Sequence, residues 1–164
     1  MPQSDQPATI TTEEKTARIR RITEIASGLS FVGDVEYRHV YSQTGGAQYG
    51  IGPSAEDDII VVFAEAFERD ADPDDFRLEA LIAHECGHQR LHREPKLRPV
   101  LAKFPGDELE EILASLVGSI LLREAATSQT LVWKATAELT DLGMTVEQAK
   151  AFADRLEKLL RKLL

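Results

Sequence analysis

Cysteine is almost absent from this chain, since Cys86 is the only one among its 164 residues. A lone cysteine cannot form an internal disulfide, which favours a reducing compartment such as the cytoplasm. Long apolar runs are missing too: no segment has about eighteen uninterrupted apolar residues, so no membrane-spanning helix is predicted. Residues 1–10 are rich in Pro, Gln, Ser and Thr, and they predict a flexible tail rather than a signal peptide. We therefore expect a cytoplasmic protein that has no membrane contact.

Basic residues are also scarce, because 19 Lys and Arg face 28 Asp and Glu, which gives a formal net charge of −9. No helix-turn-helix with a basic face is visible, so direct nucleic-acid binding is not expected. The negative net charge is compatible with a basic protein partner. Hydrophobic residues make up 43% of the chain and charged residues 29%, which is ordinary for a single domain with its own core.

What the chain does contain is His84-Glu85-Cys86-Gly87-His88, an HExxH motif. Helix positions four apart differ by about 40° in direction, so His84 and His88 can bind one zinc ion from the same face. Glu85 lies too close to the backbone to be a third ligand, and its carboxylate is predicted to act as general base on a zinc-bound water. The motif is typical of zinc hydrolases that cleave amide bonds. It also occurs by chance in proteins that bind no metal, so its context decides.

The flanking residues predict that the motif lies on a helix. Asp72 is a predicted N-cap with Pro73 in the first turn, and the helix is expected over residues 73–93, with Pro95 ending it. Cys86 lies about 200° round this helix from His84. We therefore expect Cys86 to be buried as a small hydrophobe and not to bind the metal.

A second helix is predicted to begin at residues 107–110, with Asp107 as N-cap and Glu110 completing a capping box. The apolar face of this helix continues to Leu121. Glu108 and Glu110 are interpreted as surface or capping carboxylates.

Glu111 on this second helix is the predicted third metal ligand, because a catalytic zinc needs one more protein group than two histidines. Small residues follow it at three, four and seven positions, namely Ala114, Ser115 and Gly118. Such a stripe allows two helices to approach closely, and Gly87 supplies a matching small position on the motif helix.

Two further histidines are weaker candidates. His92 lies four residues beyond His88, but three successive turns span about 12 Å, too far for three imidazoles of one helix to meet at one ion. We expect His92 to support a ligand, contact substrate or lie on the surface. His39 falls in a strand-like segment and is expected to be a half-exposed strand residue.

Residues 79–92 resemble the active-site helix of the ImmA/IrrE-type zinc peptidases, which carry AHELGH followed by an apolar residue and His. The second helix resembles the ExxANxFAxxLL pattern of that family, whose specified positions correspond here to Glu111, Ala114, Ser115, Val117, Gly118, Leu121 and Leu122. The resemblance covers residues 58–122. It implies a gluzincin core, Glu111 as third zinc ligand, a polar group at Ser115 that orients a ligand histidine, and cleavage of a protein such as a DNA-binding repressor.

The sequence departs from the family pattern at several positions. Ser115 replaces the usual Asn, Val117 and Gly118 replace Phe-Ala, Cys86 replaces an aliphatic residue, and Arg123-Glu124 replaces Met-Pro. The pattern of the two metal-binding helices is retained in spite of these changes.

The expected fold is α+β and zincin-like, with a small twisted three-stranded sheet packed on the two metal-binding helices. An amphipathic helix is predicted over residues 12–27 with Gly28 as its stop. Residues 35–41 and 47–51 are predicted to form a hairpin around a turn at residues 44–46. The continuously apolar residues 59–63 predict a strand inside the sheet. The metallopeptidase-like core is expected over residues 11–126, within a single domain overall.

Residues 127–164 are predicted to form a helical extension packed on that core. One helix is expected to start near residues 127–130 and to reach Leu142, with Gly143 ending it. Thr145 and Gln148 predict a capping box for a last helix to Leu164. The apolar stripe of this last helix is expected to cover the core, or alternatively to dock a partner or a second copy of the chain.

Two functions from different classes follow. The first is a zinc-dependent metalloprotease, with one zinc per chain on His84, His88 and Glu111, and with Glu85 as base. The alternative is a non-catalytic metal-binding or partner-binding module with a gluzincin core, of phage, toxin-antitoxin or stress-regulatory type. The oxyanion donor is left open among Tyr37, Tyr41, Tyr49, His39, His92 and Arg123.

Overall fold

A computed structural model of the chain describes residues 6–42, 45–70 and 77–164. The chain divides into two compact units, residues 1–82 and residues 83–164, and the boundary falls inside one helix, α3 (Leu78–Arg93). The predicted helix start at Asp72 and Pro73 lies outside the described residues. Within the described residues, no helix combines the length and the apolar character needed to cross a bilayer.

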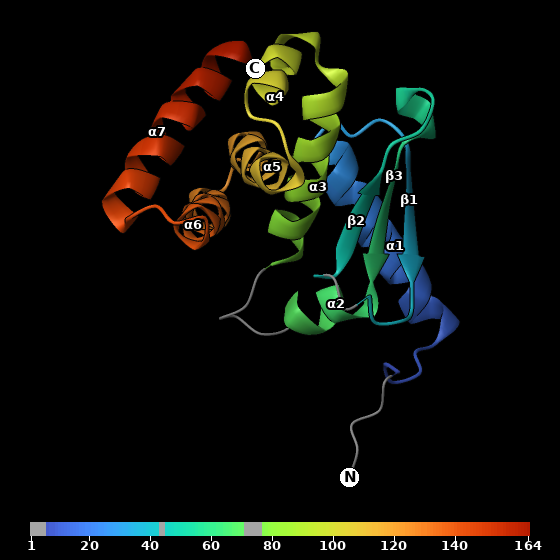
Figure 1. The fold of residues 1–164 in the computed structure, drawn as a ribbon. Coiled ribbons are helices and arrows are strands. Elements are labelled where there is room, and N and C mark those ends of the chain that lie inside the picture. The colour runs from blue at the N-terminus through green and yellow to red at the C-terminus, as the bar shows by residue number, and fades with distance from the viewer. Residues whose placement is uncertain (1–5, 43–44, 71–76) are drawn as a thin grey trace. The chain divides into compact units, whose positions relative to one another are not determined.

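The first unit begins with α1 (Thr12–Gly28), as the sequence predicts (Figure 1). Thr11 caps it, because its hydroxyl oxygen accepts a hydrogen bond from the Glu14 N–H at 3.1 Å. Ile22 and Ala26 are buried on the inner face of this helix. The N-cap residue and the spacing of the buried apolar residues therefore both indicate a helix at the position of α1.

The sheet of this unit contains β1 (Asp34–Arg38), β2 (Ala47–Gly50) and β3 (Ile59–Phe63), in the order β1-β3-β2. Strand β3 pairs parallel with β1 and antiparallel with β2 (Figure 1). The prediction of an interior strand at residues 59–63 is confirmed. The predicted hairpin of residues 35–41 with 47–51 is wrong, because β3 lies between the two strands. The fold is thus α+β with a small mixed sheet.

A buried aspartate fixes the loop that leads into β3. The fully buried Asp58 accepts hydrogen bonds from the Tyr49 hydroxyl at 2.7 Å and the Gly52 N–H at 2.8 Å. Its backbone carbonyl accepts from the Asp34 N–H, which joins the loop to the start of β1. The short helix η1 (Ala55–Asp57) precedes it, and α2 (Ala64–Asp70) follows β3.

Helix α3 begins against a charged cluster of the first unit. The Asp70 carboxylate accepts from the Leu78 N–H at 2.9 Å, and Arg21 reaches both Asp70 and Glu79. Burial acts to raise the Asp70 pKa, but the Leu78 N–H and the Arg21 guanidinium outweigh it and lower that pKa. Asp70 therefore serves as an ionised anchor for the first turn of α3.

The second unit is helical and contains the remainder of α3. After it come η2 (Pro95–Leu97), α4 (Arg98–Lys103), α5 (Asp107–Leu121), α6 (Ala125–Asp141) and α7 (Val146–Leu163). The core of this unit is made mostly of aliphatic side chains from these helices, including Leu91, Leu97, Ile112, Leu116, Leu139 and Leu160. Helix α4 is not predicted by the sequence, because its six residues are too few to show a period.

The helix starts of this unit test the capping predictions. At α7 the capping box of Thr145 and Gln148 is confirmed. At α5 the predicted box is wrong: the N-cap is Gly106, with φ of 105° and no capping side chain, and Asp107 is already the first helical residue. The start of α6 was expected near residues 127–130, yet the helix begins at Ala125, and the Thr127 hydroxyl contacts the Glu124 carboxylate within its first turn.

Candidate metal centre

Two glycines bring α3 and α5 into close contact within the second unit. A Cβ on Gly87 would lie 2.1 Å from the Ala114 carbonyl oxygen, and one on Gly118 would lie 2.7 Å from the Ala83 carbonyl oxygen. Neither helix could keep its position if these residues carried side chains. The small residues predicted from the sequence to permit a close helix approach therefore do so.

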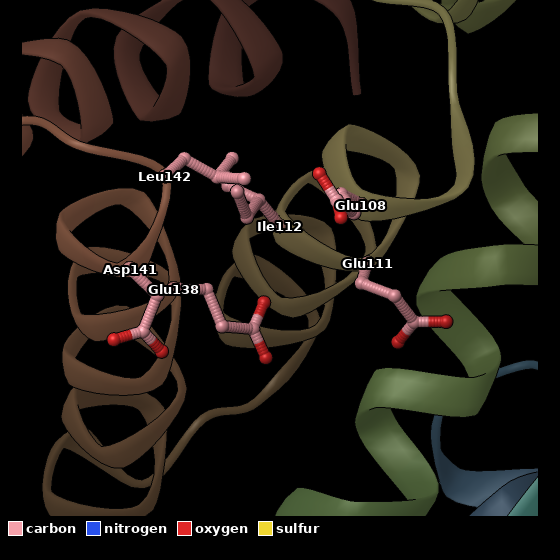
Figure 2. Close-up of a pocket in the computed structure, with 6 residues that line it drawn as sticks. All are labelled: Glu108, Glu111, Ile112, Glu138, Asp141 and Leu142. Carbon is pink, nitrogen blue, oxygen red and sulfur yellow. The ribbon is translucent and has the colours of Figure 1, made fainter.

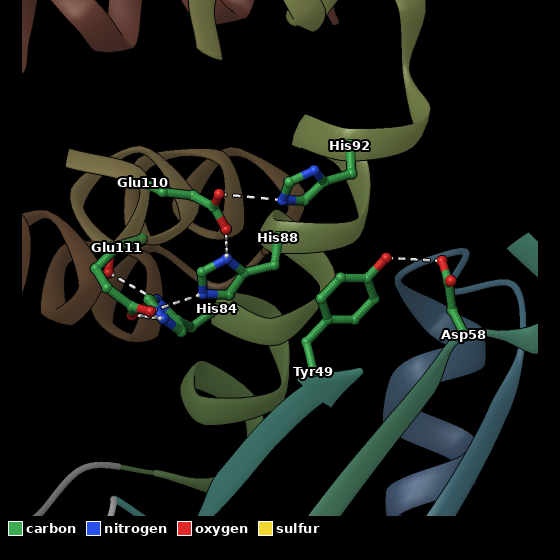
Figure 3. Close-up of polar contacts among 8 residues, drawn as sticks. Tyr49, Asp58, His84, His88, His92, Glu110 and Glu111 are labelled. Atoms are coloured by element: carbon green, nitrogen blue, oxygen red, sulfur yellow. Dashed lines mark hydrogen bonds and ion pairs between the residues drawn. The ribbon is translucent and has the colours of Figure 1, made fainter. Parts of the chain in front are cut away.

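This contact brings together His84, His88 and Glu111, the three ligands predicted from the sequence. His84 Nε2 lies 2.7 Å from Glu111 Oε2, and His88 Nε2 lies 3.2 Å from Glu111 Oε1 (Figure 3). The two imidazole rings are nearly perpendicular, at 89°, with centroids 4.9 Å apart. One ligand atom from each residue lies within 4.8 Å of the others, so the group could hold a metal ion.

The second nitrogen of each histidine is also held by a polar side chain. His84 Nδ1 lies 2.8 Å from Ser115 Oγ, and His88 Nδ1 lies 2.7 Å from Glu110 Oε2. Partners of this kind set the tautomer and orientation of metal-binding histidines. The contact of Ser115 is the one that the family resemblance implies for this position.

Glu110 is the participant that sequence reasoning missed. The sequence predicts a surface or capping carboxylate at this position, yet the two Glu110 oxygens contact His88 Nδ1 at 2.7 Å and His92 Nε2 at 3.1 Å (Figure 3). His92 thereby supports a ligand through Glu110, one of the roles expected for it. The signal that could have revealed this is the second His-x₃-His pair, His88 and His92, facing an acidic pair on α5.

Burial and charge set the protonation of the cluster. Burial lowers the pKa of His84 to about 4, and the hydrogen bond to Glu111 offsets this only in part. Burial also acts to lower the pKa of His88, but Glu111, Glu85 and Glu110 outweigh it, and the net shift is upward. The pKa of Glu111 is lowered by its hydrogen bonds with both histidines. The cluster thus contains a neutral His84, a His88 that readily takes a proton, and an ionised Glu111.

These groups fit a divalent transition metal. Two imidazole nitrogens and one carboxylate oxygen are a common donor set for catalytic zinc, although imidazole also suits copper, iron and nickel. Two ligands on one tetrahedral ion with bonds of about 2 Å lie about 3.3 Å apart. The Nε2 atoms of His84 and His88 lie at comparable distances, 2.7 Å and 3.2 Å, from the two oxygens of Glu111. The donor chemistry and the anchored second nitrogens therefore agree with a centre for a divalent transition metal.

Glu85 and Cys86 follow His84 in the same helix, and both are buried. The charge of Glu85 acts on His88, because it contributes to the raised pKa of that imidazole. Burial raises the pKa of the Cys86 thiol to about 12, which keeps it protonated. Cys86 is therefore a small buried hydrophobe, as predicted. The role of Glu85 as general base stays a prediction.

A cavity of about 280 Å³ lies beside Glu111, between α5 and α6 (Figure 2). Its lining is mostly acidic and comprises Glu108, Glu111, Ile112, Glu138, Asp141 and Leu142. Burial raises the pKa of Glu138 in spite of the nearby Lys134, and Glu138 Oε2 has no hydrogen-bond partner among the described residues. The negative charge of Glu111 contributes to that raised pKa.

The tyrosines considered as oxyanion donors are engaged within the first unit. Tyr37 accepts a hydrogen bond from Arg18, Tyr41 donates to Glu68, and Tyr49 donates to Asp58. These contacts fit the structural roles expected of the tyrosines. His39 is half-buried, but it lies just after β1 and not in the strand where it was expected. It contacts the Tyr37 hydroxyl through Nδ1 and the Ala8 carbonyl through Nε2, which fits a structural role.

Comparison of the chain with protein-family models, with curated proteins and with solved structures found no match. Functional inference therefore depends on the geometry of the cluster and on the motif residues of the two helices.

Proposed function

We propose that this chain is a zinc-dependent metallopeptidase with one metal ion bound by His84, His88 and Glu111. The observation that carries the proposal is the convergence of both Nε2 atoms on the Glu111 carboxylate, while each Nδ1 has its own polar partner. Chance HExxH sequences need not have a third ligand or anchored second nitrogens. Three protein ligands also leave one position of a tetrahedral ion open, as catalytic sites require.

The chemistry divides between the ion and the chain. A divalent cation bound here would supply a Lewis acid that polarises a carbonyl and lowers the pKa of a coordinated water. Glu85 would take the proton from the attacking water and later deliver it to the leaving amine. Glu111 and the two histidines hold their donor atoms together, because α3 and α5 are fixed by the contacts of Gly87 and Gly118.

The motifs of α3 and α5 extend the proposal to the ImmA/IrrE-type peptidases. That resemblance suggests a folded regulatory protein, such as a DNA-binding repressor, as substrate. The net charge of −9 is compatible with a basic substrate.

The test is the pair of variants Glu85→Gln and Glu108→Gln in the full chain. The metal content of each protein is measured by elemental analysis, and hydrolysis is measured on an unstructured protein and a mixed peptide library. We expect about one zinc per chain in both variants, with cleavage lost only in Glu85→Gln. Glu108 is the matched control, because it is an exposed glutamate on the helix that carries Glu111.

Two results would contradict the proposal. Retained cleavage in Glu85→Gln would exclude its role as base. A wild-type chain that binds zinc but hydrolyses no peptide and no repressor would favour the non-catalytic metal-binding module instead.

A further inference from the structure

Glu110 lies between two histidines that are four residues apart on α3. Its Oε2 lies 2.7 Å from His88 Nδ1, and its Oε1 lies 3.1 Å from His92 Nε2 (Figure 3). The Glu110 side chain is 23% exposed, so most of it is shielded from water. A single carboxylate therefore joins a predicted metal ligand to a histidine that is not part of the ligand cluster.

The chemistry of these contacts fixes the positions of the protons. An ionised carboxylate can only accept hydrogen bonds, so His88 Nδ1 and His92 Nε2 both donate to Glu110. A proton on Nδ1 leaves the lone pair of His88 Nε2 available to a cation on the side of Glu111. His92 uses its own Nε2 for the contact with Glu110.

We propose that Glu110 positions the ligand histidine His88 in the metal centre, and that His92 anchors the Glu110 carboxylate. Glu110 holds His88 in the Nδ1–H tautomer and fixes the plane of its ring. This inference rests on the metal centre of the proposed function, but it does not depend on peptide hydrolysis.

The two ligand histidines are supported unequally. His84 has a neutral hydroxyl as partner, from Ser115, whereas His88 has a charged carboxylate. A carboxylate on the second nitrogen makes an imidazole a more basic ligand. Glu110 therefore makes His88 the stronger of the two nitrogen donors.

His92 matters because a glutamate side chain is flexible. Contact through one oxygen alone would leave the Glu110 carboxylate able to turn towards water, whereas contact through both oxygens fixes its rotation. This gives the second His-x₃-His pair of the motif helix a function that the HExxH motif does not include.

The experiment measures zinc affinity of the metal-stripped full chain by competition with a chromogenic chelator. We expect Glu110→Ala to weaken zinc binding by about 10-fold to 100-fold, the usual effect of losing a partner of a ligand histidine. Glu110→Gln should lose less, because its amide oxygen still accepts from Nδ1. His92→Ala should also lose less than Glu110→Ala. Circular dichroism of each variant checks that the fold is retained.

Glu108→Ala is the matched control for charge. It removes one negative charge from the same first turn of α5, and the side chain is exposed. Its zinc affinity should stay within about twofold of the wild type. If Glu110→Ala binds zinc as tightly as Glu108→Ala does, the positioning role is wrong.

A second measurement separates positioning from general damage. In the zinc-loaded wild type, ¹⁵N NMR of the histidine side chains should show a proton on His88 Nδ1 that is protected from exchange. This protection should be lost in Glu110→Ala and retained in Glu108→Ala. An unprotected Nδ1 proton in the wild type would overturn the inference.

The outcomes also separate this inference from the proposed function. A chain that binds zinc, depends on Glu110 for affinity and cleaves no peptide would support the positioning role and contradict the peptidase. A wild-type chain that binds no divalent cation would overturn both.

Discussion

His84 Nδ1 lies 2.8 Å from Ser115 Oγ, in the buried contact between α3 and α5. A serine hydroxyl can donate or accept, so it can satisfy either tautomer of His84. Without a metal, His84 Nε2–H donates to Glu111 and Nδ1 accepts from Ser115. If Nε2 gave its lone pair to a cation, the proton would lie on Nδ1 and Ser115 would accept. Ser115 can thus satisfy His84 with or without a bound cation.

Ser115→Ala is expected to weaken zinc binding by about 10-fold to 100-fold, because Nδ1 of a buried imidazole then lacks a partner. The measurement is chelator competition with the full chain. Ser119→Ala is the matched control, since Ser119 is a buried serine one turn further along α5 that donates to the Leu116 carbonyl. Equal zinc affinities for the two variants would show that the hydroxyl at 115 does not support His84.

Gly87→Ala is expected to lower the free energy of unfolding by about 1–3 kcal/mol or more, as an overpacked core does. The added Cβ would meet the Ala114 carbonyl oxygen at 2.1 Å, so α3 and α5 must separate. Zinc affinity should fall with it, because Glu111 moves away from the histidines. Urea unfolding and chelator competition measure the two effects.

The control for this variant is Gly28→Ala at the end of α1. A Cβ there would meet no atom within 4 Å, so the substitution should be neutral or slightly stabilising. Unchanged stability in Gly87→Ala would mean that the helices are not in the close contact described.

Glu110 and Glu111 show how much of the site could be predicted from the sequence. Glu111 could be predicted, because the small residues that follow it mark the face of α5 that meets another helix. The neighbouring Glu110 was harder to assign, because the His88–His92 pair hints at a carboxylate partner but the choice of Glu110 depends on how the two helices cross. The spacing of small residues along a helix identifies the face that meets another helix. Which side chains pair at the edge of that face depends on the tertiary arrangement.

The sheet gives a second case. The apolar run at residues 59–63 correctly predicted an interior strand, and the glycines at 45 and 46 suggested a hairpin between the strands before it. In a three-stranded sheet these expectations exclude each other, because the central strand pairs with both others. Burial favoured β3 at the centre: four of its five residues are buried, and they gain most from two neighbours.

Acidification is expected to destabilise the metal-free chain through His84. Its pKa of about 4 in the folded chain lies below the ordinary 6.5, so between these values the unfolded chain binds a proton that the folded chain does not. This proton stabilises the unfolded state by about 2 kcal/mol between pH 7 and pH 5. His88 acts in the opposite sense: its raised pKa adds stability below its ordinary pKa, which is lost as the pH rises through the folded value.

A variant isolates the His84 effect from the other groups. Urea unfolding with a chelator present is compared at pH 7 and pH 5 for the wild type and for His84→Asn. The variant should lose about 2 kcal/mol less stability on acidification than the wild type does. An identical loss in both proteins would mean that His84 is not buried in a neutral form.

Tyr49→Phe is expected to destabilise the first unit, because Tyr49 donates to a carboxylate that has no exposure to water (Figure 3). Removing the hydroxyl leaves Oδ2 of Asp58 without that donor, and a lost hydrogen bond to a buried charge costs about 1.5–3 kcal/mol. Tyr41→Phe is the matched control, since its hydroxyl donates to Glu68 at the exposed surface. Thermal unfolding should show a lower midpoint for Tyr49→Phe and an unchanged one for Tyr41→Phe. Equal midpoints would mean that the Tyr49 hydroxyl adds nothing to the stability that Asp58 gains from its other contacts, such as the Gly52 N–H.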